Sequence, residues 1–499
     1  MILKILKRYG QPISYALILG GAIWFWMDSF QAPSQNSSNP VAIEAAEIHP
    51  TPSLEKVESE DTDEHIVFYH PLSKNKRVSY WWNGVSEAIK DHGIHAKPEH
   101  SNIRLKDFVG SEKCSECHPS NYRKWYQHSH RRMNALAIPE NVMGDFSGNS
   151  VMNYLGGEAS FYRINEQYRM KLARDGTTRI YSVNRTIGSR FFQYYIGTLI
   201  DGPEPESAPI RKIEHVLPIG YWLEEKEWVP IVHVDDELPD NERIDPYETT
   251  DSLAYDRQCS TCHTTRPVGD WMLSMGSGKR MDRFSPKVIA FDVSAYINEN
   301  HANTFSDTLT TEKPDTIPFT RIVEEMSHLP ARQYASALGI GCEACHQGGR
   351  DHVSASTTTS TSSNPRFFPS SPHMYMNRKN PEDAWSRNTE NVNWICSKCH
   401  SGSRPQFAAG MATWNSTEFS NAEKGFCYDM SKAKAHGKSS LTCIHCHDPH
   451  KGIGTQWSTP PEQDDQSCIS CHDRFSQSEK IAAHTHHSPD SQGSRCMNC

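Results

Sequence analysis

The clearest hydrophobic pattern in this chain is an alternation of apolar and polar residues between residues 160 and 188. The segment SFYRINEQYRMKLARDGTTRIYSVNRTIG repeats with a period of two, which predicts β-strands, and Asp175-Gly176 predicts a hairpin turn between two of them. The segments RFFQYYIGTLI, EHVLPIGYWL and EWVPIVHV predict further strands. We therefore expect an antiparallel β insert within residues 150–250.

A second apolar pattern lies at the N-terminus. Residues 1–30 hold an apolar run from Ile13 to Met27 behind three basic residues, and no A-x-A cleavage site follows. We expect a transmembrane signal anchor that places the chain on the periplasmic side of the bacterial inner membrane, with a secreted periplasmic protein after signal cleavage as the alternative. The Ser-, Pro- and acid-rich residues after it predict a flexible acidic tether and a short N-terminal segment, together residues 31–108.

The remaining residues show little periodicity and are marked by cysteines instead. Seven Cys-x-x-Cys pairs use fourteen of the fifteen cysteines, and histidine follows directly in six of them. The six are CSECH, CSTCH, CEACH, CSKCH, CIHCH and CISCH, and the seventh, CMNC, ends the sequence. We interpret CMNC as a motif whose histidine is missing, in a fragment or a truncated product.

This spacing has a chemical explanation. Two thiols three positions apart can each form a thioether to haem, and the adjacent imidazole can bind the iron. Zinc sites do not need histidine after the second cysteine, and disulfides do not dictate this spacing, so both are weaker explanations. The sequence thus predicts haem c at six complete sites and a seventh without its histidine, held through Cys114, Cys117, Cys259, Cys262, Cys342, Cys345, Cys396, Cys399, Cys443, Cys446, Cys468, Cys471, Cys496 and Cys499.

Each complete motif supplies one proximal iron ligand. These histidines are His118, His263, His346, His400, His447 and His472. Twenty histidines remain, and some of them lie close to a motif, which makes them candidates for the second, distal position. The distal candidates are His128, His130, His352, His436, His450, His484, His486 and His487.

Other sulfur and imidazole groups favour simpler interpretations. Met133 and Met143 are possible thioether ligands, but core packing is the preferred interpretation. Cys427, the cysteine outside the pairs, is typical of a buried small residue rather than a reactive thiol. His445 lies inside a motif, and we interpret it as a bystander.

Composition fits this picture. Only 36% of residues are hydrophobic, which fits small cores completed by covalently held cofactors, and motifs crowd together after Gly341 so that neighbouring haems must lie close. The net charge of −9 gives no reason to expect nucleic acid as a partner. We expect a mainly α and irregular multihaem cytochrome c, with the antiparallel β insert between the first and second haem motifs, a first haem segment at 109–149 and a multihaem domain at 251–499 that is incomplete at its C-terminus.

Several stretches together resemble a known family. VGSEKCSECHPSNYRKWYQHSH, YSVNRTIGSRFFQYYIG, YDRQCSTCHTT, IGCEACHQGGRDH, LTCIHCHDPHKG and HTHHSPDSQGSRCMNC make residues 108–499 similar to multihaem c-type cytochromes of the cytochrome c-552/4 kind, whose members often continue into tetratricopeptide repeats. The resemblance implies haem at the motifs, with His352 and His450 as axial ligands. Relatives of that kind include electron carriers, nitrite reductases and hydroxylamine oxidoreductases.

The leading functional expectation is a membrane-anchored periplasmic cytochrome that passes single electrons between redox partner proteins, a membrane quinol-linked donor or a periplasmic acceptor. One alternative is an oxidoreductase of small nitrogen or sulfur compounds with one open haem, although no motif is CxxCK. Another is an assembly scaffold in which the haems serve mainly as core. The catalytic residues of an enzyme would be unknown from the sequence.

Overall fold

The computed structural model describes most of the chain from residue 78 onward. The described residues are 78–81, 84–97, 100–234, 236–238, 242–274, 288–305, 319–358, 365–377, 384–401, 418–425, 428, 441–452 and 461–496. The predicted anchor and most of the tether lie outside them, as do His436, Cys427 and Cys499.

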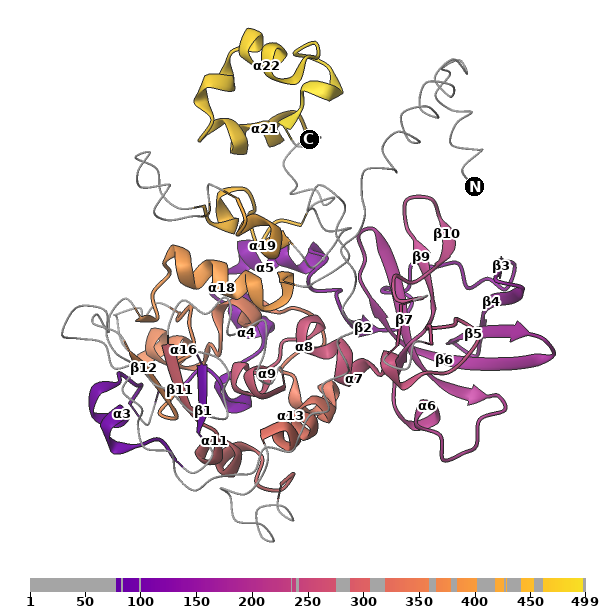
Figure 1. Ribbon diagram of the computed structural model, residues 1–499, viewed down its shortest axis with the longest axis horizontal. Helices are drawn as coiled ribbons and strands as arrows, with labels where there is room; N and C mark the ends of the chain where they lie inside the picture. Colours follow the sequence, from indigo (N-terminus) through magenta and orange to yellow (C-terminus); the bar gives the residue numbers. More distant parts are fainter. Residues whose placement is uncertain are drawn as a thin grey trace, which may run out of the picture. The chain divides into compact units, whose positions relative to one another are not determined.

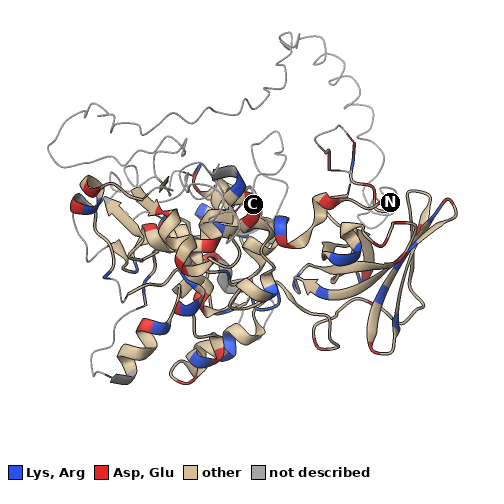
Figure 2. Ribbon diagram, turned by 90° about the horizontal axis from the view of Figure 1, so that it is seen from below, with Lys and Arg blue, Asp and Glu red and all other residues tan. Residues whose placement is uncertain are grey.

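The largest element is a nine-stranded antiparallel sheet (Figure 1). Seven of its strands lie in the order β10-β9-β7-β6-β5-β4-β3, while β2 pairs with β6 and β8 with β7. The strands are β2 (Ala135–Leu136), β3 (Val151–Tyr154), β4 (Gly157–Ile164), β5 (Gln167–Arg174), β6 (Thr177–Ile187), β7 (Phe192–Asp201), β8 (His215–Val216), β9 (Ile219–Trp222) and β10 (Glu227–Pro230). Acidic and basic residues are interspersed along these strands (Figure 2).

The alternating pattern explains how the long strands form and turn. The predicted hairpin is confirmed: Arg174 pairs with Thr177, and Asp175 and Gly176 both adopt positive φ, at 50° and 77°. One face of the sheet is packed with aromatic rings, among them Phe161 stacked on Trp228 with centroids 3.4 Å apart. Alternate burial along each strand therefore gives the sheet its own core.

A second sheet lies among the helices. It has the order β1-β11-β12, from β1 (Val78–Trp81), β11 (Val288–Asp292) and β12 (Met374–Asn377), with the first pair parallel and the second antiparallel. Buried side chains from these strands and from helices share one core with Trp271, Phe368 and Trp394. This core is assembled from segments that are far apart in the sequence.

The described helices are short. They are α3 (Glu87–His92), α4 (Ser111–Ser115), α5 (Pro119–Gln127), α6 (Pro209–Lys212), α7 (Tyr255–Gln258), α8 (Ser260–His263), α9 (Val268–Ser274), α11 (Val293–Asn300), α13 (Phe319–His328), α14 (Ala331–Tyr334), α15 (Cys342–His346), α16 (Arg350–Thr358), α18 (Thr389–His400), α19 (Glu418–Ala422), α21 (Pro461–Ile469) and α22 (Ser478–Thr485).

The expectation of a mainly α and irregular fold is wrong. In the described part of the chain 37% of residues are helical and 22% lie in strands, with a nine-stranded sheet that is nearly closed. The sheet begins at Ala135, before the expected insert, because the short β2 pairs with β6 through Ala135 and Thr186. Two-residue strands and the dispersed strands of the second sheet carry too few residues to show a period of two.

The expected localisation also needs correction. Within the described residues no helix is long and apolar enough to cross a bilayer, which conflicts with a membrane-anchored protein on the periplasmic side of the inner membrane. The longest described helix that carries a CxxCH motif, α18, has twelve residues, whereas a spanning helix needs roughly 20. Residues 1–30, on which the anchor was predicted, lie outside the described residues.

Candidate haem-binding site

The CxxCH motifs share one local structure. In four of them the histidine N–H donates to the carbonyl of the first cysteine, four residues earlier, at 2.9 Å for His118, 3.2 Å for His263, 3.0 Å for His447 and 2.9 Å for His472. The motifs at Cys342 and Cys396 lie within the helices α15 and α18. A helical turn places residues three and four apart on one face, so both thiols and the imidazole of a motif are presented together.

The first and third motifs are joined by hydrogen bonds from backbone N–H groups of one to side chains of the other. The buried carboxylate of Glu343 accepts hydrogen bonds from the N–H groups of Val109 and Gly110 at 2.9 and 2.8 Å, just before α4. Its neighbour Cys342 donates its N–H to the hydroxyl of Ser111 at 3.1 Å. Sequence reasoning missed Glu343, although an acidic residue inside a CxxCH motif is a visible signal.

The second, third and fourth motifs meet around Lys398, which lies between the two cysteines of CSKCH. The Lys398 ammonium donates to the carbonyl of Ala344 at 2.9 Å, and the Cys262 thiol donates to the carbonyl of Lys398 at 3.8 Å. The fifth motif joins them because the Cys443 N–H donates to the side chain of Asn393 on α18 at 3.1 Å. Four motifs separated widely in sequence are therefore neighbours in space.

Thiols of different motifs also contact one another. Hydrogen bonds between motifs raise the pKa of three thiols, and the partners are Cys114 with Cys342, Cys399 with Cys262, and Cys396 with Cys443. The hydrogen bond from Cys114 correspondingly lowers the pKa of Cys342 to about 7. Groups attached at these cysteines would share walls rather than occupy separate pockets.

The histidine rings form pairs that join a motif to a distant residue. His118 faces His352 with ring centroids 6.3 Å apart and planes 16° apart, and His346 faces His450 at 6.2 Å and 8°. A third pair joins His400 and His130 at 6.1 Å with planes tilted by 56°. Each pair combines one CxxCH histidine with one predicted distal candidate.

These separations fit a haem iron between the rings. An imidazole nitrogen binds a metal ion at about 2 Å, so two rings on opposite sides of one ion have centroids roughly 6 Å apart. The stacked rings of His128 and His130 are closer, with centroids 4.4 Å apart, and leave no room for an ion between them. In the described part of the chain no three His, Cys, Asp or Glu side chains gather as a metal-binding group, whereas a haem needs only two protein ligands on its iron.

Burial keeps several of these rings in the form that binds iron. It is the largest cause that lowers the pKa of His130 to about 3 and that of His346 to about 4. Both rings are therefore neutral at pH 7, with a lone pair for a metal. The Nδ1 atom of His400 lies 2.9 Å from a carboxylate oxygen of Glu418, which orients the ring with Nε2 as the ligand atom.

The other distal candidates lie elsewhere. His128 stacks on His130 and accepts a hydrogen bond from the His130 N–H, at 3.0 Å to its Nδ1. His484 packs on Phe475, which also contacts the proximal His472, while His486 ends α22 with φ of 60° and His487 follows it. The structure thus pairs His130, His352 and His450 with motif histidines and does not show such a ring pair for these four.

Three residues with simpler interpretations can be placed as well. His445 accepts a hydrogen bond from the Thr442 N–H at 3.1 Å, which closes a turn inside its motif. Met133 packs against an apolar cluster, while Met143 is 37% exposed and is not a core residue. The bystander role of His445 therefore has a structural basis.

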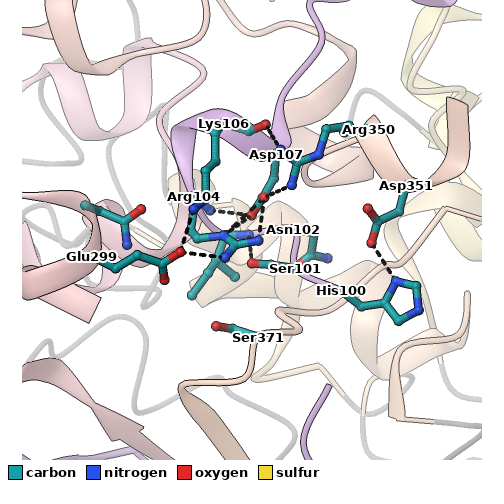
Figure 3. Close-up of polar contacts among 12 residues, drawn as sticks. His100, Ser101, Asn102, Arg104, Lys106, Asp107, Glu299, Arg350, Asp351 and Ser371 are labelled. Atoms are coloured by element: carbon teal, nitrogen blue, oxygen red, sulfur yellow. Dashed lines mark hydrogen bonds and ion pairs between the residues drawn. The ribbon is translucent and has the colours of Figure 1, made fainter. Parts of the chain in front are cut away.

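A buried ion-pair network fixes the helix that carries His352 (Figure 3). Asp107, fully buried, accepts hydrogen bonds from Arg104 and, at 2.6 Å, from the Arg350 guanidinium. Arg350 is the first residue of α16 and lies two positions before His352. Glu299 extends the network, because it accepts hydrogen bonds from Arg104 at 2.9 Å and from Lys106 at 2.5 Å.

This network predicts an acid-dependent stability. Burial raises the pKa of Glu299, but hydrogen bonds from Lys106 and His373 outweigh it and lower that pKa to about 2. A carboxyl group whose pKa falls on folding stabilises above its unfolded pKa of about 4.3 and loses that contribution as the pH falls. We expect the free energy of unfolding in urea to drop between about pH 5 and 2, by on the order of 1 kcal/mol from this partly exposed group. Glu299→Gln should flatten that decline, and an equal slope in both proteins would contradict the assignment.

Comparisons with known proteins add little. No family model and no curated protein matches the chain. Among solved structures, the outer cell wall cytochrome OcwA is similar over 78% of this chain and 92% of its own, with 13% identity and a TM-score of 0.25. That score is too low to support an argument about fold or function. The resemblance to cytochrome c-552/4 proteins therefore stays a prediction from the sequence motifs.

Proposed function

We propose that this chain is a multihaem c-type cytochrome that passes single electrons along closely spaced haems, most of them with two histidine ligands. The observation that carries the proposal is the set of three ring pairs, His118 with His352, His346 with His450 and His400 with His130. The two residues of these pairs lie 234, 104 and 270 positions apart in the sequence, yet their rings meet at the separation that one metal ion between them requires.

The cysteines and the histidines would have separate roles in binding haem. The paired cysteines of each motif would hold haem covalently, and the two histidines of each pair would both ligate its iron. When bound, haem supplies a one-electron couple of iron, and its two imidazoles favour electron transfer over binding of small molecules. Contacts between thiols of neighbouring motifs support short distances between successive haems. The partners that fit this role are redox proteins that deliver and accept single electrons.

Mass and spectra of the matured protein test the proposal. The full chain, expressed with cytochrome c maturation machinery, should gain six haems by intact mass and show a haem c pyridine haemochrome spectrum. Serine in place of Cys345 should lower the yield of fully loaded protein, because one thioether at the third motif is lost. Zinc in place of haem, or no bound haem, would contradict the proposal.

Carbon monoxide separates a carrier from an enzyme. Iron with two histidine ligands in the reduced state should not bind carbon monoxide, so most of the haem absorbance should stay unchanged under the gas. A complete shift of one haem band would instead favour the alternative, an oxidoreductase of small nitrogen or sulfur compounds at one open haem.

A further inference from the structure

His233 lies between the nine-stranded sheet and the second CxxCH motif. It follows β10 by three residues, in a turn where the Val234 N–H donates to the Ile231 carbonyl at 3.1 Å. Ile231 belongs to the apolar cluster that also contains Tyr255, and both Val234 and Cys259, the first cysteine of the second motif, pack against this cluster. The segment that follows β10 therefore places His233 near the second motif.

The ring of His233 is held in one orientation. Its Nδ1 lies 2.8 Å from a carboxylate oxygen of Asp236, and the Asp236 N–H donates to the His233 carbonyl at 3.1 Å. A carboxylate at Nδ1 fixes the tautomer in which Nε2 carries the lone pair and raises the basicity of that nitrogen. His400 has the same arrangement with Glu418, at 2.9 Å.

His263, the histidine of the second motif, lies within electrostatic reach of this ring. Burial lowers the pKa of His263 to about 4, and the charge of His233 is the next largest cause. The Nδ1 atom of His263 is buried, with no hydrogen-bond partner among the described residues. His263 is thus a deeply buried imidazole that is affected electrostatically by His233 and, less strongly, by His400.

We infer that His233 is the second axial ligand of the haem attached at Cys259 and Cys262, with Asp236 as the residue that positions its ring. The inference rests on the proposed haem-binding function and extends it to the β insert. The sheet would then be part of the redox unit, because the segment that leaves β10 would complete one haem site. The sequence signal is His233 followed three positions later by a carboxylate.

Two other residues near the second motif provide matched controls. Met133 packs against the same apolar cluster as Cys259 and carries a thioether that can bind iron. His215 is 2% exposed and forms a backbone β-bridge with Ala254. Its ring Nδ1 lies 2.8 Å from the Ile213 carbonyl oxygen. Met133→Leu and His215→Gln therefore alter the same region without removing His233.

The experiment uses matured full-length protein with its haem content measured by intact mass. His233→Ala should keep the wild-type number of haems but convert one from low to high spin in the ferric electron paramagnetic resonance spectrum. After reduction, about one sixth of the haem should newly bind carbon monoxide, because one of six irons has lost a ligand. Asp236→Asn should keep all haems low-spin and raise the midpoint potential of one, because a less basic imidazole stabilises ferric iron less.

Each outcome decides a separate claim. Unchanged spin state and carbon monoxide binding in His233→Ala would overturn the inference, as would the same conversion in Met133→Leu or His215→Gln instead. If His233→Ala does not mature into folded protein, the potentials of Asp236→Asn decide, and an unchanged set of midpoints overturns the inference. A wild-type protein without haem would overturn the proposed function itself, whereas full haem content with a silent His233→Ala would remove only this ligand.

Discussion

Replacement of His450 by methionine should raise the midpoint potential of one haem and leave the number of attached haems unchanged. His450 faces His346 with centroids 6.2 Å apart and nearly parallel planes, so it is the residue placed to fill the second axial position at the third motif. A thioether is a weaker donor to ferric iron than an imidazole, and His/Met iron has the higher potential. The shift should be on the order of 0.1 V, within the roughly 0.8 V that axial ligands span. Spectroelectrochemical titration of the matured protein measures it.

A control for this prediction is His445, which lies inside the fifth motif, five positions before His450 in the sequence. His445 closes a turn through its bond with the Thr442 N–H, so His445→Gln should leave every midpoint unchanged. His352→Met should raise the potential of a different haem, the one at the first motif, because His352 faces His118. Identical titration curves for wild type, His450→Met and His352→Met would remove both ligand assignments.

The ring pairs show how far the sequence could lead to the site. The CxxCH spacing determines which cysteines and which proximal histidine act together, since the five residues of a motif lie within little more than one helical turn. Proximity to a motif in sequence made His130, His352 and His450 candidates, yet each of them faces the histidine of a different motif from the one it adjoins. Which motif histidine each candidate faces depends on long-range packing between motifs, so the sequence alone does not define these pairs.

The fold was predictable where the signal is local. The Asp175-Gly176 turn and the strands beside it follow from alternation and turn chemistry. The second sheet could not be predicted in this way. Its strands Val78–Trp81 and Met374–Asn377 both pair with β11, although Val78 and Met374 lie 296 positions apart in the sequence. Such short strands gain stability from the core they share with Trp271 and not from a pattern of their own.

Asp107→Ala should destabilise the protein by about 3–5 kcal/mol, because it removes the centre of a buried ion-pair network. The Asp107 carboxylate accepts hydrogen bonds from the Arg104 backbone N–H at 2.9 Å and from its guanidinium at 3.0–3.2 Å. It also accepts the 2.6 Å bond from Arg350 at the start of α16. Arg104 is itself 5% exposed, so its charge would lose its main partner in a site with little access to water.

The loss should reach the haem site through α16. Arg350 holds the first turn of the helix that presents His352, so Asp107→Ala should also increase the fraction of high-spin haem in the protein that does mature. Asp351→Ala is the matched control: its carboxylate is partly exposed and meets His100 at 3.2 Å, so its loss should cost less than about 1 kcal/mol. Urea unfolding followed by circular dichroism compares the two. Both substitutions remove one carboxylate near α16, and the two carboxylates differ chiefly in their burial. Equal stabilities of the two variants would therefore show that the buried network does not hold α16 in place.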